Sequence, residues 1–351
     1  MTTPITVEVL DRIKPALASQ ISHAPRELRG LTYADCRLEV KEVQTATAEN
    51  GQSKQGSRDA TMSLGIRALA GGKMLASGYY GRLLGAKDVS TVPEIVREGL
   101  RHATTRAMAS AAQKIALKRQ TAGLGKSLTS TTLAAIPIRQ ENVPASFQID
   151  PRSVPLSEII RHTTEVSRKV AALDPAIRYN HLTSITQLTR HLFVSSEGTL
   201  IDQSGALTEG SCYVVAERNG VVQEDWDAIG AQRGFEVLLH GVTDAWVRHP
   251  DLATFAWELA RETLALCTTP PCPTTPDPVV VVTDPHFNTL LCHEIIGHPT
   301  ELDRALKMET AYAGRSWLLQ DLAVHQIGRP IASPAVTAYS DPSLPGYGHY
   351  R

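Results

Sequence analysis

A cluster of prolines divides this 351-residue chain into a longer and a shorter part. Five of the eleven residues from Thr268 to Pro278 are proline. Proline has no backbone N–H and a fixed φ, so such a segment can be neither a helix interior nor a central strand. We therefore predict a proline-rich linker at 268–278, followed by the start of a C-terminal domain at 279–351.

The region before the prolines predicts an α+β fold made of two lobes, each with a helix and strand hairpins. The expected boundaries are an N-terminal α+β domain at 1–125, a linker rich in Thr, Ser and Pro at 126–155, and a middle α+β domain at 156–267. The order of helix and then hairpins occurs twice. This repetition suggests an internal α+β duplication.

Two glycine-containing turns locate hairpins within these lobes. Gly71-Gly72 separates two alternating segments, at 61–69 and 73–80, and therefore predicts a hairpin in the first lobe. Asn219-Gly220 is a strong signal for a two-residue hairpin turn in the second lobe, because both residues tolerate a positive φ.

Composition and charge exclude several classes of protein. Hydrophobic residues make up 42% of the chain and charged residues 20%, with a formal net charge of -1. A general nucleic-acid binder would carry a basic excess or stripe, so we expect no nucleic-acid partner. No run of about 18 apolar residues occurs, so we expect no membrane association. Five cysteines without regular pairing, and no signal-peptide pattern at the N-terminus, predict a cytoplasmic protein.

The residues that can carry chemistry form the motif His293-Glu294-Ile295-Ile296-Gly297-His298. Two imidazoles and a carboxylate suit a hydrolytic zinc site, because neutral nitrogens bind the metal and a glutamate accepts a proton from water. The histidines are five positions apart, which in a regular helix turns them about 140° away from each other. An opening at Gly297, or a π-type turn, would bring His298 back toward His293, and Pro299 favours such a break.

The residues before the motif predict a strand and a helix that support it. Val279–Val282 is a continuous β-branched run, which is typical of a strand buried on both faces. Asp284-Pro285 supplies an N-cap and a first-turn proline, so a helix should extend from there to about Gly297. We therefore expect the motif to lie on a strand-helix segment.

The segment around the motif resembles the signature of the TldD/PmbA family of zinc metallopeptidases. Thr289 to His298, followed by Glu301 and Asp303, is similar to the family pattern LLHEAVGH-x-x-E-x-D. Three further segments also resemble the family. Ser63–Ala68 is similar to its GVGVRA strand, Tyr312–Arg315 to the stretch after its motif, and Asp341–Tyr350 to the approach to its DDEG element.

The resemblance implies a zinc-dependent peptidase subunit of the catalytic, TldD-like type. By position in the motif, His293 and His298 correspond to zinc ligands and Glu294 to the general base. The family implies cleavage of unfolded or extended peptides, for degradation or for peptide maturation, inside a dimer of identical or related subunits. The substrate backbone is expected to be held by strand addition.

Two departures from the family pattern leave alternatives open. Pro299 stands where the family usually has glycine. The family's third zinc ligand is a cysteine in a more C-terminal part, so we expect the catalytic domain to be incomplete here. The local substitutes for that ligand are Glu301, Asp303, Glu309, His325 and His349. The alternative hypothesis is therefore a non-catalytic, peptide-binding partner subunit. The family's older label, modulator of DNA gyrase, suggests a third hypothesis, a regulator that binds a protein.

Overall fold

The computed structural model describes residues 5–120, 136–245, 247–307, 309–318, 325–341 and 343–344. Residues 126–135 of the expected linker and the candidate ligand His349 lie outside this part. The chain divides into two compact units, one comprising Met1–Thr269 with Ser343–Arg351 and the other Pro270–Pro342. Both helices and strands are present, which confirms the predicted α+β class.

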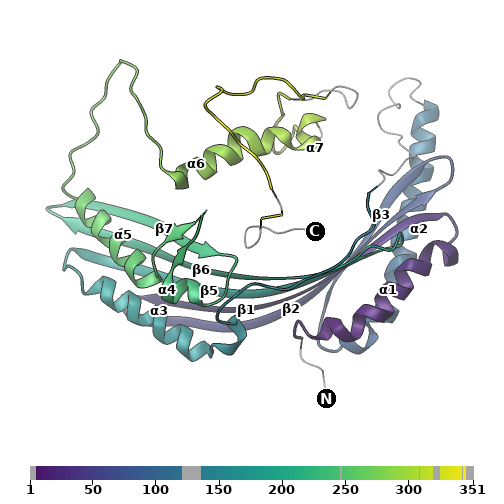
Figure 1. The fold of residues 1–351 in the computed structure, drawn as a ribbon, viewed down its shortest axis with the longest axis horizontal. Coiled ribbons are helices and arrows are strands. Elements are labelled where there is room, and N and C mark those ends of the chain that lie inside the picture. The colour runs from purple at the N-terminus through teal and green to yellow at the C-terminus, as the bar shows by residue number, and fades with distance from the viewer. Residues whose placement is uncertain are drawn as a thin grey trace. The chain divides into compact units, whose positions relative to one another are not determined.

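The larger unit is built on a seven-stranded sheet (Figure 1). The strand order is β3-β2-β1-β5-β6-β4. Strand β7 also pairs with β6, along residues 208–218, whereas β4 pairs with residues 200–203 of β6. All neighbours are antiparallel except β4 and β6. The strands are β1 (Leu31–Glu49), β2 (Gln52–Gly71), β3 (Leu75–Leu84), β4 (Gln140–Val143), β5 (Ile177–Ser195), β6 (Leu200–Arg218) and β7 (Val221–Ala231); β8 (Val242–Thr243) and β9 (Arg248–His249) form a separate two-stranded ribbon.

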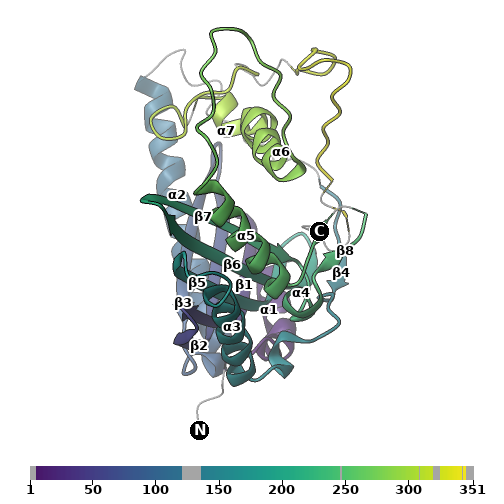
Figure 2. The same cartoon turned by 90° about the vertical axis from the view of Figure 1, so that its left-hand side faces the viewer.

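Four long helices pack on the same face of the sheet (Figures 1 and 2). On β1 the side chains of Cys36 and Leu38 point to this face and are fully buried, whereas Arg37 on the opposite face is exposed. The helices are α1 (Val9–Glu27), α2 (Val92–Gln120), α3 (Leu156–Ala171) and α5 (Leu252–Leu266), with the short α4 (Glu236–His240) and the 3-10 turns η1 (Val89–Thr91) and η2 (Pro151–Ser153) between them. Among its described residues, the larger unit places no helix on the opposite face (Figure 1).

The larger unit consists of two halves with the same order of elements. The first runs α1-β1-β2-β3-α2 and the second α3-β5-β6-β7-α5, with α4 before the last helix. In each half two strands of 19 or 20 residues are followed by a shorter one, of 10 residues in β3 and 11 in β7. The halves join where β1 pairs with β5, from Asp35 opposite Ser195 to Glu49 opposite His181. The repeated order expected from the sequence is therefore present.

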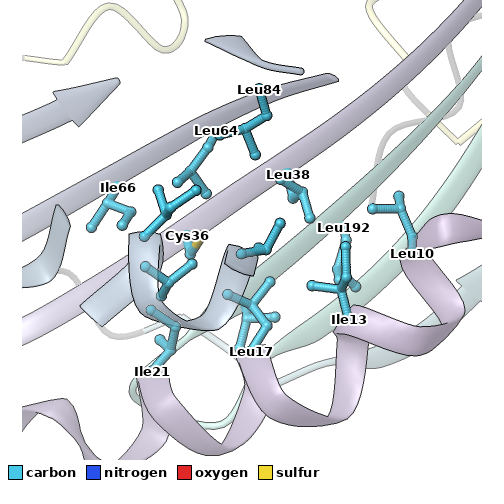
Figure 3. Packing of buried hydrophobic residues seen from close by; sticks show 14 of the residues in the cluster. Leu10, Ile13, Leu17, Ile21, Cys36, Leu38, Leu64, Ile66, Leu84 and Leu192 are labelled. Carbon is cyan, nitrogen blue, oxygen red and sulfur yellow. The ribbon is translucent and has the colours of Figure 1, made fainter. Parts of the chain in front are cut away.

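Each half has its own hydrophobic core between helices and sheet. In the first, Leu10 and Leu17 of α1 pack with Leu38 of β1 (Figure 3). In the second, residues of α3 and α5 pack on β5 and β6.

Helix α2 lies very close to strand β3, because a Cβ added to Gly78 of β3 would lie 2.0 Å from the carbonyl oxygen of Ala103 in α2. Glycine at position 78 therefore lets this helix reach the sheet.

Both predicted hairpins are present. The turn between β6 and β7 has positive φ at Asn219 (52°) and at Gly220 (80°), as a type I′ turn requires. The strands on either side of Gly71-Gly72 pair as β2 and β3. In the first lobe the strands are longer than the alternating segments alone suggested.

The smaller unit carries α6 (Pro285–Cys292), the π-helical turn η3 (His293–Gly297), the 3-10 turn η4 (His298–Thr300) and α7 (Leu302–Ala305). The predicted start of α6 is confirmed, since Asp284 accepts a hydrogen bond from the Phe287 N–H at 2.7 Å. The strand predicted at Val279–Val282 is wrong, because this segment pairs with no strand among the described residues and Val280 is 93% exposed. A β-branched run becomes a strand only where a neighbour accepts its backbone hydrogen bonds. None of the described helices combines the length and apolar character needed to cross a bilayer.

Candidate metal centre

The candidate metal centre lies where α6 changes from α-helical to π-helical hydrogen bonding. The N–H of His293 still bonds within the α-helix, to the carbonyls of Leu290 and Thr289. The N–H of His298 bonds to the carbonyl of His293, five residues earlier. A π-turn adds one residue per turn, which brings positions five apart onto the same face. Of the two alternatives predicted from the spacing, an opening at Gly297 or a π-type turn, the structure has the π-type turn.

Gly297 allows this turn but is not sterically required for it. Its φ and ψ, -57° and -62°, are right-handed helical values that any residue adopts. A Cβ at this position would meet only the Cys292 carbonyl oxygen, at 3.9 Å. Pro299 lies in the first turn of η4, where the proline ring is tolerated. Proline in place of the family's usual glycine is thus compatible with the turn.

The turn brings the two histidines and the glutamate of the motif together. The Nε2 atoms of His293 and His298 are 2.8 Å apart, and their rings are nearly perpendicular with centroids 4.3 Å apart. A carboxylate oxygen of Glu294 lies 3.9 Å from Nε2 of His298. One possible ligand atom from each residue lies within 4.8 Å of the others. Three groups predicted to act together are therefore adjacent.

Glu301 contacts the outer nitrogen of His298. Nδ1 of His298 hydrogen-bonds to Oε1 of Glu301 at 2.7 Å, and the carboxylate also forms an ion pair with Arg304. The hydrogen bond to His298, with the nearby Arg304, lowers the pKa of Glu301 from its ordinary value. An ionised Glu301 accepts the Nδ1 proton, which leaves the Nε2 lone pair of His298 available to a metal.

The other described candidates for a third zinc ligand lie outside the cluster formed by the motif. Asp303 accepts a hydrogen bond from the Arg304 N–H at 2.8 Å and is outside the cluster of His293, Glu294 and His298. Among the described residues, neither Glu309 nor His325 belongs to that cluster. Glu301 therefore orients a histidine in this structure, whereas the sequence had suggested it as a direct ligand. Arg304 was missed, although its spacing of three from Glu301 in a helical turn was a visible signal.

The donor set fits a zinc ion. Two imidazole nitrogens bound to tetrahedral zinc are about 3.3 Å apart, given Zn–N bonds of about 2.0 Å. The 2.8 Å between the Nε2 atoms of His293 and His298 therefore needs to widen by only about half an ångström. A carboxylate behind a ligating histidine, as Glu301 is behind His298, is the usual outer partner of such a site. His293 and His298 could hold the metal, with Glu294 beside it.

A cavity of about 690 Å³ adjoins the candidate metal centre. Phe287 and Leu290 of α6 form its apolar part, and His293 and Glu294 its polar end. His286 also lines the cavity but is outside the metal-binding cluster. The volume is in the range of small-ligand sites, so a substrate segment could be placed beside the reactive groups.

Comparison with known proteins identifies the central part of the chain. Residues 149–266 match the family model of the PmbA/TldA metallopeptidase central domain. This stretch covers the second half of the sheet, from α3 to α5. A 158-residue segment is 26% identical to a protein named Metalloprotease from Methanothermobacter thermautotrophicus, and it covers 45% of this chain and 30% of that protein.

Two solved structures align with a large part of the chain. TldE from Thermococcus kodakarensis aligns with 72% of this chain at 11% identity and a TM-score of 0.44. A candidate modulator of DNA gyrase from Bacteroides thetaiotaomicron aligns with 74% at 10% identity and a TM-score of 0.46. The chain spans 47% and 50% of the lengths of these two proteins.

The matched central domain makes this a metallopeptidase-like protein. More specifically, the matched domain, residues 149–266, is the central domain of the TldD/PmbA family, the family that the sequence around the motif resembles.

Proposed function

We propose that this chain is the metal-binding subunit of a zinc-dependent peptidase that hydrolyses unfolded or extended peptides, in degradation or in peptide maturation. The observation that carries the proposal is the convergence of His293 Nε2 and His298 Nε2 beside the Glu294 carboxylate. Two nitrogen ligands and an adjacent base are the groups that metal-assisted hydrolysis needs from a protein.

Each residue of the motif then has a definite role. Zinc, when bound, polarises the peptide carbonyl and makes water more acidic. Glu294 accepts the proton of the attacking water on a carboxylate oxygen and passes it to the departing amine. Glu301 holds His298 with its proton on Nδ1, so that Nε2 faces the metal. The cavity beside Phe287 and Leu290 supplies the place for the substrate.

The partner and the compartment are part of the same proposal. We expect the chain to act as a homodimer, or as a heterodimer with a related family subunit, in the cytoplasm. Peptide is the expected substrate. Nucleic acid is not an expected partner, since the formal net charge is only -1, and a membrane is not expected because the sequence has no run of about 18 apolar residues. The alternative is a partner subunit that binds peptides without cutting them, and it is favoured because, apart from the proposed base Glu294, the cluster within the described residues contains two possible ligands, His293 and His298.

Cleavage of an unstructured fluorogenic peptide tests the proposal. Glu294→Ala is expected to lower kcat by about 10²–10⁴-fold, the usual contribution of a general base. Glu309→Ala, in the same unit but outside the cluster, serves as the matched control and should leave kcat unchanged. Cleavage that survives Glu294→Ala excludes the proposed base, and wild-type protein that binds the peptide without cleaving it supports the partner-subunit alternative.

Metal content gives a second, independent measurement. About one zinc per chain is expected in wild-type protein, and His293→Ala should lose it, because one nitrogen alone holds the metal poorly. Little zinc in both proteins would show that the two histidines are not sufficient.

A further inference from the structure

The sheet face that carries no helix of the larger unit has a pocket with three arginines. The cavity has a volume of about 740 Å³ and is formed by β1, β2, β3 and β5. Its lining includes Arg37, Arg67, Arg82, Tyr79 and His191. This volume is in the range of sites for small ligands or for one or two residues of a peptide. The pocket belongs entirely to the larger unit and does not involve the metal centre.

One of the arginines is held in place by a buried carboxylate. Asp35 is only 3% exposed and accepts hydrogen bonds from Arg67, at 2.8 Å to Nε and 2.6 Å to Nη2. Burial and the charge of Asp35 raise the pKa of the adjacent Tyr33 to about 12. The charge of Asp35 is therefore neutralised within the protein, and Arg67 is fixed at the edge of the pocket.

A second arginine has an unneutralised charge. Arg37 is exposed, and its guanidinium lies over the ring of Phe193, 5.5 Å from the centroid. No carboxylate of the described residues forms an ion pair with it. Glu39, on the same face, is 3.3 Å from His191. The guanidinium of Arg37 is thus positioned by an aromatic ring while all its N–H donors stay available.

The third arginine and an apolar surface complete the pocket. Arg82 forms one hydrogen bond, at 2.8 Å, with Asp88 and is 41% exposed. The ring of Tyr79 lies over two glycines, because a Cβ on Gly65 would be 2.8 Å from the tyrosine hydroxyl and one on Gly81 would be 2.8 Å from the ring. The pocket therefore combines a basic side with a flat apolar side.

We propose that this pocket binds a carboxylate group carried by an extended peptide, with Arg37 as the principal contact. The planar guanidinium can bind a carboxylate through two parallel hydrogen bonds. Arg67 and Arg82 are each paired with a carboxylate, Asp35 and Asp88, so Arg37 supplies the unpaired positive charge of the pocket. Tyr79 contacts the methylene groups or the backbone next to the carboxylate. The carboxylate belongs either to an acidic side chain or to the C-terminus of the peptide.

Binding of three short peptides, measured by calorimetry at low ionic strength, tests this proposal. The full chain carries Glu294→Ala so that no peptide is cut, which makes the result independent of the proposed hydrolysis. The first peptide, Ala-Ala-Glu-Ala-Ala with both ends blocked, carries a side-chain carboxylate. The second has glutamine in place of glutamate, and the third is the glutamine peptide with a free C-terminal carboxylate.

We expect at least one carboxylate peptide to bind about tenfold more tightly than the blocked glutamine peptide, as one charge-assisted contact provides. Which of the two binds identifies the source of the carboxylate. Arg37→Gln should abolish the preference. Lys41→Gln should keep it, because Lys41 lies on the same face of β1 but outside the pocket. Thermal unfolding checks that Arg37→Gln is folded. Arg82→Gln is a second variant, and it should also reduce the preference for the carboxylate peptide.

Equal affinities for all three peptides would overturn the proposal. It is also overturned if Arg37→Gln and Lys41→Gln weaken binding equally, since the effect would then reflect only the overall charge of the protein.

Discussion

Replacing Asp202 with alanine is expected to destabilise the larger unit strongly. Asp202 lies near the start of β6, and its side chain is only 2% exposed. Its carboxylate accepts two hydrogen bonds from Arg190 of β5, both of 2.7 Å, and one of 2.9 Å from Lys14 of α1. This carboxylate therefore ties the first helix to the second half of the sheet.

The size of the effect follows from burial and from the partners that remain. Removing one member of a buried ion pair costs about 3–5 kcal/mol, because the other charge stays desolvated. Arg190 is 14% exposed but keeps a 2.6 Å contact with Asp11 and a hydrogen bond to the Val7 carbonyl. We therefore expect the low end, about 3 kcal/mol, which lowers Tm by about 6–12 °C in a unit of this size.

Asp11→Ala provides the matched control. Asp11 contacts the same guanidinium, but its side chain is 62% exposed. A solvated pair of this kind contributes at most about 1 kcal/mol. Urea unfolding followed by circular dichroism measures both variants. If the two substitutions cost the same, or if Asp202→Ala costs less than the control, burial does not set the strength of this network.

Three further expectations concern pH, zinc and packing. Burial opposes ionisation of Asp202, but hydrogen bonds from two basic side chains hold its pKa below the ordinary value. Its stabilisation is thus present above about pH 4 and is lost as pH falls through the lower folded pKa, so wild type should lose more stability than Asp202→Ala on acid titration of unfolding. Glu301→Gln should weaken zinc binding about 10–100-fold in a chelator competition, with Asp303→Asn as the unaffected control. Gly78→Ala should cost about 1–3 kcal/mol in urea unfolding, because its Cβ would meet a backbone oxygen of α2, whereas Gly72→Ala has open space around it and should be neutral.

Features determined by neighbouring residues could be predicted from the sequence. Asn219-Gly220 requires positive φ at two successive positions, and few structures other than a hairpin turn accommodate that. The five-residue spacing of His293 and His298 is incompatible with a shared face on a regular helix, so a site built from them needed an irregular turn. In both cases the constraint was contained within a few residues.

Features that depend on distant partners could not be predicted. The run Val279–Val282 is as β-branched as a buried strand, but composition does not show whether a neighbouring strand is present. The pairing of β1 with β5, which joins the two halves of the sheet, connects residues about 146 positions apart, such as Glu42 and Leu188. Such a pairing has no local sequence signal, because the register is determined by how the two cores pack.

The arginine pocket was missed for the same reason. Arg37, Arg67 and Arg82 come from three strands and have no motif spacing. They meet because the strands are in register, with Arg37 opposite Gly65 and Gly65 opposite Gly81. The glycines at these two positions leave the space in which the Tyr79 ring lies. A sequence pattern can reveal each strand, but the shared pocket exists only once the pairing is known.

The position of the backbone irregularity bears on the role of the motif. Helix α6 keeps α-helical bonding up to His293, and the π-turn begins at the first residue that could bind a metal and ends before the second. Neither glycine nor proline forces the change, since Gly297 has ordinary helical angles and Pro299 lies beyond the turn. A π-turn is less favourable than continued α-helix, and π-turns within helices are frequent at functional sites. What this turn achieves is the convergence of two imidazole nitrogens, with Glu301 behind one of them. An irregularity confined to these residues supports the proposed metal site.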